Sequence, residues 1–331
     1  MMRKYQVVIT DFIQDELEPE RKILGDLADL TALGARGEEN LNGHVEDADA
    51  IMVYHDMSMS AKTIQRLRRC KLIVRCGVGF DNVDCNEARQ YGIPVANVPD
   101  YGCEEVADSA TAMVLSLARG VAYLNSRLRA GRGAWHYGQA VPLHRLRNRV
   151  MGIVGLGRIG TAMAIRAKAF GMDVVFHDPY KPDGFDKALG IRRVEHLDDL
   201  MRMAYVLSLH CPLTVETRHL INQKTLSLMP QGGYLVNTAR GAIVDQTALL
   251  KAIESGHLSG VGIDVLEQEP PEEGDPLIRA WRDPDHPAFH RVLINPHSAF
   301  YSEEGLLDIR IKGAEACRRA LCGEPVRNII N

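Results

Sequence analysis

The sequence RVMGIVGLGRIG, residues 149–160, decides the fold of this chain. A short apolar run leads into a GxGxxG turn formed by Gly155, Gly157 and Gly160, and an alanine-rich run that continues as a helix follows. In such a unit the first glycine permits a tight turn, the second lets the backbone approach a pyrophosphate, and the third lets helix and strand pack closely. The helix N-terminus then faces the phosphates. The stretch therefore predicts a dinucleotide-binding βαβ unit.

An acidic residue completes this pattern. Asp178 ends the next apolar run, MDVVFHD. A carboxylate at this place accepts hydrogen bonds from the adenosine ribose and repels a 2′-phosphate, which favours NAD over NADP. A glycine turn without a ligand is the alternative, but strand, turn, helix and acid occur together here, and that context favours the dinucleotide.

The composition is that of a two-domain globular protein. The chain has 331 residues, 46% of them hydrophobic, enough for two separate cores. A net charge of −4 gives no attraction for nucleic acid or anionic membranes, and neither is an expected partner. Neither a signal-peptide pattern nor an apolar run of the ~20 residues that cross a bilayer is found, so a cytoplasmic location is expected. The seven cysteines contain no CxxC pair, so neither a disulfide framework nor a metal site is expected.

Apolar runs alternate with amphipathic segments in both halves of the chain. In the first half, β-runs at 5–10, 50–55, 72–79 and 94–98 are interleaved with helices expected at about Pro19–Leu30 and Ala61–Arg69. A longer helix begins at Glu104, and beyond the glycine turn β-runs recur at 205–214, 233–245, 259–270 and 291–299. This alternation predicts βαβ units with parallel sheets.

Three segments depart from the alternation. Residues 120–149 combine glycines, aromatic residues and arginines, and the residues alone leave a basic surface loop and an oligomer-forming arm as equal alternatives. Residues 270–290 are acidic and proline-rich, and we expect a loop there. The segment from Ser302 is expected to form a helix and a tail that return to the first domain.

Three ionisable residues follow the later β-runs: Arg240 in NTARG, Glu269 in EQEP and His297 in NPHSA. Open parallel sheets bind ligands outside the carboxyl ends of their strands. A guanidinium can hold the carboxylate of a 2-keto acid or polarise its carbonyl. A histidine can give a proton to the oxyanion formed by hydride transfer, and Glu269 would pair with that imidazole and favour its charged form. The three residues predict a hydride-transfer site.

Each residue also has a purely structural interpretation. Arg240 could lie in a surface turn, Glu269 in a solvated loop, and His297 could satisfy a hydrogen bond in the core, but their joint occurrence after a dinucleotide unit favours catalysis. In the first half, Arg75 and the glycines of RCGVGFDNVD could bind a carboxylate through backbone N–H groups and the guanidinium, with a plain glycine turn as the alternative.

With these residues, the chain resembles the D-isomer-specific 2-hydroxyacid dehydrogenases, and among them the branch that includes the C-terminal-binding-protein corepressors. The matching stretches run nearly from end to end: MVYH, RCGVGFDNVD, EEVADSA, GIVGLGRIG, HDPY, LHCPLT, LVNTARGAIVD, EQEP, NPHSAFYSEE and RNIIN. The resemblance implies an α/β protein with two domains, both with parallel sheets. A Rossmann NAD-binding domain, 102–299, would be inserted into a flavodoxin-like substrate domain, 1–101 and 300–331. It also implies a homodimer through the Rossmann domain, with 120–149 as its arm.

Site residues follow from the resemblance by position. Arg240, Glu269 and His297 match the family's catalytic set. The implied contacts to NAD are Gly155, Gly157, Arg158, Ile159, Gly160 and Asp178 at the pyrophosphate and ribose, Cys211, Pro212 and Thr217 along the cofactor, and Thr238, Ala239 and Asp264 near the nicotinamide. The implied substrate contacts are Arg75, Val78 and Gly79 at the carboxylate, together with His55.

Two departures from the family pattern concern the substrate. Asn295 stands where the family usually has Thr, and Phe300 stands where the corepressor branch has a substrate-stacking Trp. An aromatic surface is kept, but its preference stays open. Tyr54, Phe300 and Trp281 are expected to shape the substrate cleft.

The resemblance leaves three functions to compare. The first is NAD-dependent interconversion of a 2-keto acid such as glyoxylate or hydroxypyruvate and a D-2-hydroxy acid. The second is an NADH-sensing, corepressor-like dimer, and the third is a 3-phosphoglycerate dehydrogenase. The intact catalytic set favours the enzyme, and the end of the sequence at Asn331, without a polar tail or a regulatory extension, is expected to count against the other two.

Overall fold

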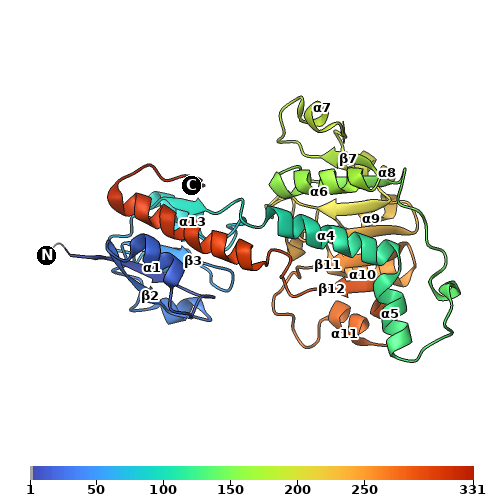
Figure 1. Cartoon of the computed structure of the whole chain (residues 1–331), viewed down its shortest axis with the longest axis horizontal. Coiled ribbons are helices and arrows are strands. Elements are labelled where there is room, and N and C mark those ends of the chain that lie inside the picture. The colour runs from blue at the N-terminus through green and yellow to red at the C-terminus, as the bar shows by residue number, and fades with distance from the viewer. Residues whose placement is uncertain (1–2) are drawn as a thin grey trace. The chain divides into compact units, whose positions relative to one another are not determined.

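The computed structural model describes residues 3–331 and contains two compact units (Figure 1). The first unit comprises the chain up to Gly102 together with Ser302–Asn331, and the second is Cys103–Tyr301. Every strand pairing within the two sheets is parallel. The expected fold class, two α/β domains with parallel sheets, is confirmed.

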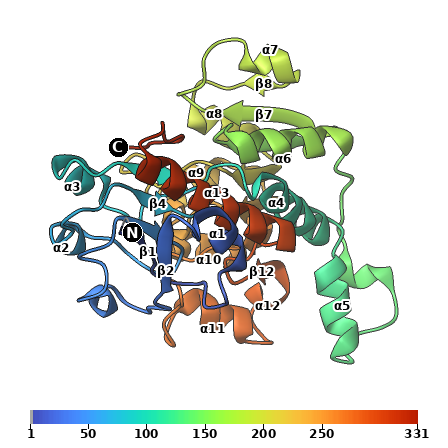
Figure 2. The same ribbon diagram turned by 60° about the vertical axis from the view of Figure 1, so that its left-hand side comes forward.

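The first unit is a five-stranded sheet with the order β2-β1-β3-β4-β5, the flavodoxin-like order. Its elements are β1 Tyr5–Ile9, α1 Glu18–Leu24, β2 Ala28–Ala32, the 3₁₀ helix η1 Glu38–Leu41, β3 Ala50–Val53, α2 Ala61–Ile64, β4 Ile73–Arg75, α3 Cys85–Gln90, β5 Val95–Asn97 and α13 Glu303–Cys322. Helix α13 lies beside α1 over β3 and β4 (Figures 1 and 2). The two ends of the unit's sequence thus share one face of its sheet.

An ion-pair cluster fastens α13 to α1. Arg310 of α13 donates from Nε and Nη2 to the carboxylate of Glu20, at 2.8 and 2.7 Å, and from Nη1 and Nη2 to Asp15, at 2.6 and 2.8 Å. Glu20 is completely buried. Because a buried carboxylate is costly without a partner, Arg310 is essential to this packing.

Two expected helices of the first unit are wrong in extent. The helix expected at Pro19–Leu30 ends at Leu24, and Ala28–Ala32 forms the edge strand β2, which pairs along its whole length with β1. The helix expected at Ala61–Arg69 ends at Ile64. The pairing of Ala28–Ala32 with β1 outweighs the helical spacing of the apolar residues that precede this strand in the sequence.

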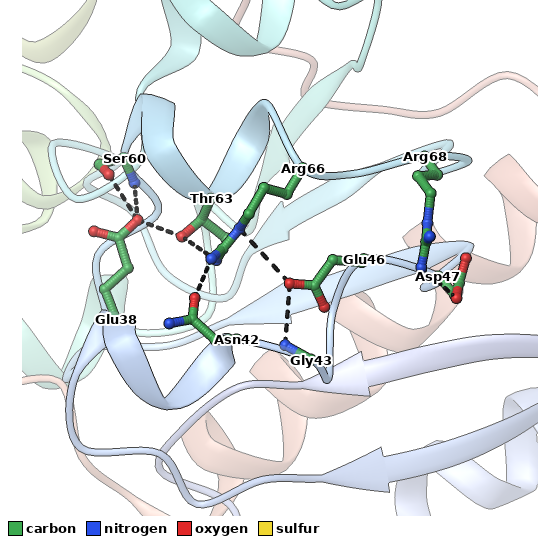
Figure 3. A network of polar contacts seen from close by, with 9 residues as sticks. All are labelled: Glu38, Asn42, Gly43, Glu46, Asp47, Ser60, Thr63, Arg66 and Arg68. Carbon is green, nitrogen blue, oxygen red and sulfur yellow. Dashed lines mark hydrogen bonds and ion pairs between the residues drawn. The ribbon is translucent and has the colours of Figure 1, made fainter.

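A polar network holds the short helix α2 and the residues after it (Figure 3). One carboxylate oxygen of Glu38 accepts hydrogen bonds from the Ser60 N–H at 2.8 Å, the Ser60 hydroxyl at 2.7 Å and the Thr63 hydroxyl at 2.6 Å. Beyond the helix, Arg66 turns toward Asn42 and Glu46. These contacts tie the α2 segment to the loop that carries η1.

The second unit is a seven-stranded sheet with the order β12-β11-β10-β9-β6-β7-β8. Counted from β6, this is the Rossmann order with β12 added at one end. Its elements are α4 Cys103–Ala118, α5 Val121–Arg129, η2 Tyr137–Ala140, β6 Val150–Val154, α6 Arg158–Ala169, β7 Asp173–His177, α7 Phe185–Leu189, β8 Arg192–Arg193, α8 Leu197–Met203, β9 Val206–Leu209, α9 Gln223–Leu228, β10 Gly233–Asn237, η3 Gly241–Ile243, α10 Gln246–Glu254, β11 Leu258–Ile263, α11 Pro276–Arg282, α12 Ala288–Arg291 and β12 Val292–Ile294. One core cluster underlies α4 and α6, and another underlies α8 to α12.

The expectation of a loop at 270–290 is wrong. The segment contains α11 and the start of α12. Asp275 caps α11 by accepting the Ile278 N–H at 2.9 Å, and Leu277 and Ile278 are buried. The acidic and proline residues mark the N-terminus of a helix here, because Pro at the first helical position and a capping Asp favour helix initiation.

Two residues expected to shape a substrate cleft, Tyr54 and Trp281, pack on the cores of their own units. Tyr54 is completely buried and stacks on Phe12 with ring centroids 5.7 Å apart. Trp281 packs against the second unit's core from α11.

Within the described residues, no helix combines the length and the apolar character needed to span a membrane.

Candidate active site

The glycine turn after β6 is shaped by two close backbone approaches. Gly155 has φ +87°, and a Cβ there would lie 2.7 Å from the Cys211 nitrogen. A Cβ on Gly160 would lie 2.1 Å from the carbonyl oxygen of Gly155, so α6 can approach β6 only with glycine at this position. A Cβ on Gly157 would meet nothing within 4 Å. The open side of the turn, at the N-terminus of α6 with Arg158 and Ile159, therefore has room for a ligand.

Asp178 lies against this turn. One of its carboxylate oxygens accepts the Leu156 N–H at 2.8 Å, and the other accepts the Tyr180 N–H at 3.0 Å. Each carboxylate oxygen has further lone pairs, so the same side chain can also accept ribose hydroxyls. The backbone bonds fix the carboxylate at the edge of the turn.

The remaining residues expected along a dinucleotide lie in the loops after β9 and β10. Burial raises the pKa of the Cys211 thiol to about 11, so it adds no charge beside the turn. Thr217 accepts the Thr214 N–H at 2.7 Å and donates to the Pro212 carbonyl at 2.6 Å, which shapes the loop after β9. The buried Thr238 hydroxyl lacks a hydrogen-bond partner among residues 3–331, and a ribose hydroxyl would supply one.

Asn237 and Gly241 fix the turn that carries Arg240. Asn237, buried at the end of β10, accepts the Ala239 N–H at 3.0 Å and donates to the Arg240 carbonyl at 2.9 Å. A Cβ on Gly241 would lie 1.9 Å from the Leu266 carbonyl carbon. The turn that carries Arg240 thus packs backbone to backbone against the loop that leads to Glu269.

His297 and Glu269 form a hydrogen-bonded pair. The His297 Nδ1 lies 2.7 Å from Glu269 Oε2, while Glu269 Oε1 accepts the Leu266 N–H at 2.6 Å. A carboxylate at Nδ1 makes that nitrogen the donor and leaves Nε2 as the nitrogen that would act on a substrate. His297 has φ +50°, a conformation that non-glycine residues seldom adopt and that clusters at functional sites. The Phe300 ring stands edge-on to the imidazole, with centroids 6.3 Å apart.

Asp264 holds the turn that carries His297. Its carbonyl accepts the His297 N–H at 2.7 Å, and its carboxylate accepts the N–H groups of Ser298 at 2.9 Å and Ala299 at 3.0 Å. Burial raises the pKa of Asp264, against the opposing effect of these N–H groups. The sequence indicated Asp264 as a nicotinamide contact and gave no sign of this second role.

The three ionisable residues occupy one edge of the sheet. Strands β10, β11 and β12 are adjacent and in register, with Asn237 opposite Ile263 and Ile263 opposite Ile294. Arg240, Glu269 and His297 follow these strands. A guanidinium and a carboxylate-held imidazole at neighbouring strand ends can bind an anionic substrate and transfer a proton.

In the first unit, the RCGVG turn follows β4. Arg75 is largely buried, and its guanidinium donates to the Cys76 carbonyl at 3.0 Å and to Asn82 at 3.3 Å. Gly77 has φ +156°, and a Cβ there would overlap the guanidinium. Arg75 therefore organises the turn, which leaves the backbone of Val78 and Gly79 at its surface. His55 follows the adjacent strand β3, and its ring is 5.5 Å from that of Phe12.

No group of three or more His, Cys, Asp or Glu side chains in the described part of the chain is suited to hold a metal ion.

Known proteins resemble this chain over most of its length. Residues 111–299 match the model for the NAD-binding domain of D-isomer-specific 2-hydroxyacid dehydrogenases. The D-3-phosphoglycerate dehydrogenase of Methanocaldococcus jannaschii is 31% identical over 98% of this chain and 59% of its own length, and C-terminal-binding protein 1 of Caenorhabditis elegans is 33% identical over 94% and 43%. The chain thus spans only about half the length of these two relatives. The structure of a D-lactate dehydrogenase from Aquifex aeolicus with NAD and lactic acid is similar with a TM-score of 0.84, at 30% identity over 96% of each chain.

Proposed function

Because the chain belongs to the D-isomer-specific 2-hydroxyacid dehydrogenase family, we propose that it interconverts a small 2-keto acid and a D-2-hydroxy acid with NAD as its cofactor. The observation that carries this proposal is the His297–Glu269 pair, 2.7 Å apart, at the strand end next to the one that carries Arg240. The compounds named for its relatives, 3-phosphoglycerate and lactic acid, are both 2-hydroxy acids.

In this mechanism NADH, when bound, supplies the hydride that reduces the keto carbon. Arg240 binds the substrate carboxylate and polarises the carbonyl. His297 donates a proton from Nε2 to the developing alkoxide, and in the oxidative direction it takes the proton back. Glu269 at Nδ1 orients the ring and stabilises the imidazolium.

The test of the proposal is NADH oxidation with a panel of 2-keto acids that includes glyoxylate, hydroxypyruvate and bulkier analogues. Turnover with at least one of them supports the enzyme. Binding of NADH without any turnover, together with NADH-dependent dimerisation, would favour a corepressor-like function instead. Preferential turnover of 3-phosphohydroxypyruvate, the 2-keto acid that corresponds to 3-phosphoglycerate, would identify a 3-phosphoglycerate dehydrogenase.

Asp178 should set the preference for NAD. Replacing it with Asn removes the charge and keeps one oxygen acceptor, so one of the Leu156 and Tyr180 N–H groups, which bond to separate carboxylate oxygens, loses its partner. We expect NADH to bind more weakly and the preference over NADPH to fall roughly 10-fold, because the repulsion of the 2′-phosphate is lost. Dissociation constants from nucleotide fluorescence measure both effects. An unchanged preference would show that Asp178 does not face the ribose.

We also propose that the chain dimerises through the arm 120–149. Trp135 and Tyr137 of the arm are 89% and 75% exposed, which is unusual for large aromatic side chains in a monomer. The same unit has a cavity of about 650 Å³ whose lining includes Met113, Phe289 and Leu293 and could receive such an arm from a second copy.

Truncating the arm's aromatic residues should weaken this dimer. Trp135→Ala with Tyr137→Ala should raise its dissociation constant about 30-fold or more, since buried aromatic anchors dominate interfaces. Sedimentation velocity over a range of concentrations measures the constant. Tyr91→Ala, at an exposed aromatic of the first unit, is the matched control. If both changes leave the dimer equally stable, the arm does not form the interface.

A further inference from the structure

A side-chain contact connects the two loops beside the glycine turn. Tyr180 follows β7 and Glu216 follows β9, and these strands lie on either side of β6. The Tyr180 hydroxyl donates a hydrogen bond to the Glu216 carboxylate. The contact therefore spans the carboxyl end of β6, where the strand order reverses and a dinucleotide enters a sheet of this type.

The contact brings the carboxylate of Glu216 toward that of Asp178, which is expected to accept hydrogen bonds from the adenosine ribose. Asp178 is bonded to the Tyr180 N–H at 3.0 Å, so the two carboxylates are linked through the same tyrosine. The hydrogen bond and charge of Glu216, with a smaller effect of Asp178, raise the pKa of the Tyr180 hydroxyl. Both negative charges thus act at one place, the outer edge of the ribose site.

The nearby cations have other partners, with one exception. Lys181 lies over the Phe185 ring, 5.1 Å from its centroid. Arg193 forms ion pairs with Asp183 at 3.5 Å and Glu195 at 3.1 Å. Arg218, two residues after Glu216, pairs with Glu267 at 3.4 Å. Arg158 lies at the exposed start of α6. The 2′-phosphate of NADPH would therefore lie near the carboxylates of Asp178 and Glu216 and near Arg158.

We propose that Glu216, held in place by Tyr180, is a second specificity-determining residue that discriminates against NADPH. The inference rests on the proposed function for its cofactor site, but it concerns nucleotide binding and not the chemistry of the keto acid. A 2′-phosphate carries a charge of about −1.5 to −2, so a carboxylate near it lowers affinity even across solvent. The sequence motif around Asp178 contains no sign of this residue, which lies in a different loop.

The test compares dissociation constants for NADH and NADPH, measured by nucleotide fluorescence, in the wild type and three variants. Glu216→Gln removes the charge and keeps an acceptor for Tyr180. We expect it to tighten NADPH binding about 5- to 10-fold and to leave NADH binding nearly unchanged. The gain should shrink at high ionic strength, because exposed charges are screened. Tyr180→Phe releases Glu216 without removing its charge and should give a smaller gain.

Glu254→Gln is the matched control, because it also removes one exposed carboxylate from the second unit. Glu254 ends α10, which runs back from the carboxyl edge of the sheet, so this change should leave the ratio of the two constants unaltered. An unchanged ratio in Glu216→Gln, or equal weakening of both nucleotides, would overturn the inference. Failure of every keto acid to turn over would count against the proposed function alone, since the nucleotide constants are measured without substrate.

Discussion

Replacing His297 with alanine should lower kcat by about 10²- to 10⁴-fold and leave the dissociation constant for NADH nearly unchanged. The imidazole is held by Glu269 at 2.7 Å and stands on a turn that Asp264 fixes, and in the proposed mechanism it transfers a proton and does not bind nucleotide. Steady-state kinetics with the best keto acid and a separate NADH titration measure the two quantities.

The control for this change is His286→Ala. His286 also pairs with a glutamate, Glu254 at 3.2 Å, but this pair involves the far end of α10. The His286→Ala protein should therefore keep the kcat of the wild type. Loss of NADH binding by a folded His297→Ala protein would place His297 in the cofactor site, and an unchanged kcat would remove its acid–base role.

Replacing Arg310 with alanine should destabilise the first unit by about 3–5 kcal/mol, because it leaves the buried carboxylate of Glu20 without its partner. Both tryptophans, Trp135 and Trp281, belong to the second unit. Urea unfolding followed by circular dichroism should therefore show a shifted transition, while the transition seen by tryptophan fluorescence should change less.

Arg318→Ala tests whether burial is the cause. Arg318 lies on the same helix, α13, and pairs with Glu324 at 3.0 Å on the protein surface. Its loss should leave the unfolding transitions nearly unchanged, since exposed ion pairs contribute little. Equal shifts for the two variants would contradict the importance of the buried Glu20.

Much of the fold could be predicted from the sequence, because glycine spacing and apolar runs are local signals. The turn at 155–160 and the strands that follow it required no tertiary information. The strand Ala28–Ala32 could not be predicted, since it is a half-exposed edge strand defined by its pairing with β1. The burial of Tyr54 was missed for a related reason: only the packed first unit shows that this side chain points into the core.

The candidate active site, like the fold, could be predicted from the sequence only in part. Arg240, Glu269 and His297 could be proposed because parallel strands place the residues after them on one edge. The contacts that hold these three residues in place could not be predicted. Asn237 and Asp264 use their side chains to fasten turns, and the sequence indicates their chemistry but not the N–H groups they face. Tyr180 and Glu216 lie 36 positions apart and meet only because β7 and β9 flank β6.

The stereochemistry of the product tests the central claim most directly. The protein is incubated with a 2-keto acid that it turns over and with NADH that carries deuterium at both C4 positions, and the product is resolved by chiral chromatography and mass spectrometry. The account predicts the D-2-hydroxy acid with one deuterium at C2, formed in equal amount to NAD. An L-2-hydroxy acid, a product without deuterium, or NADH oxidation without hydroxy acid would contradict it.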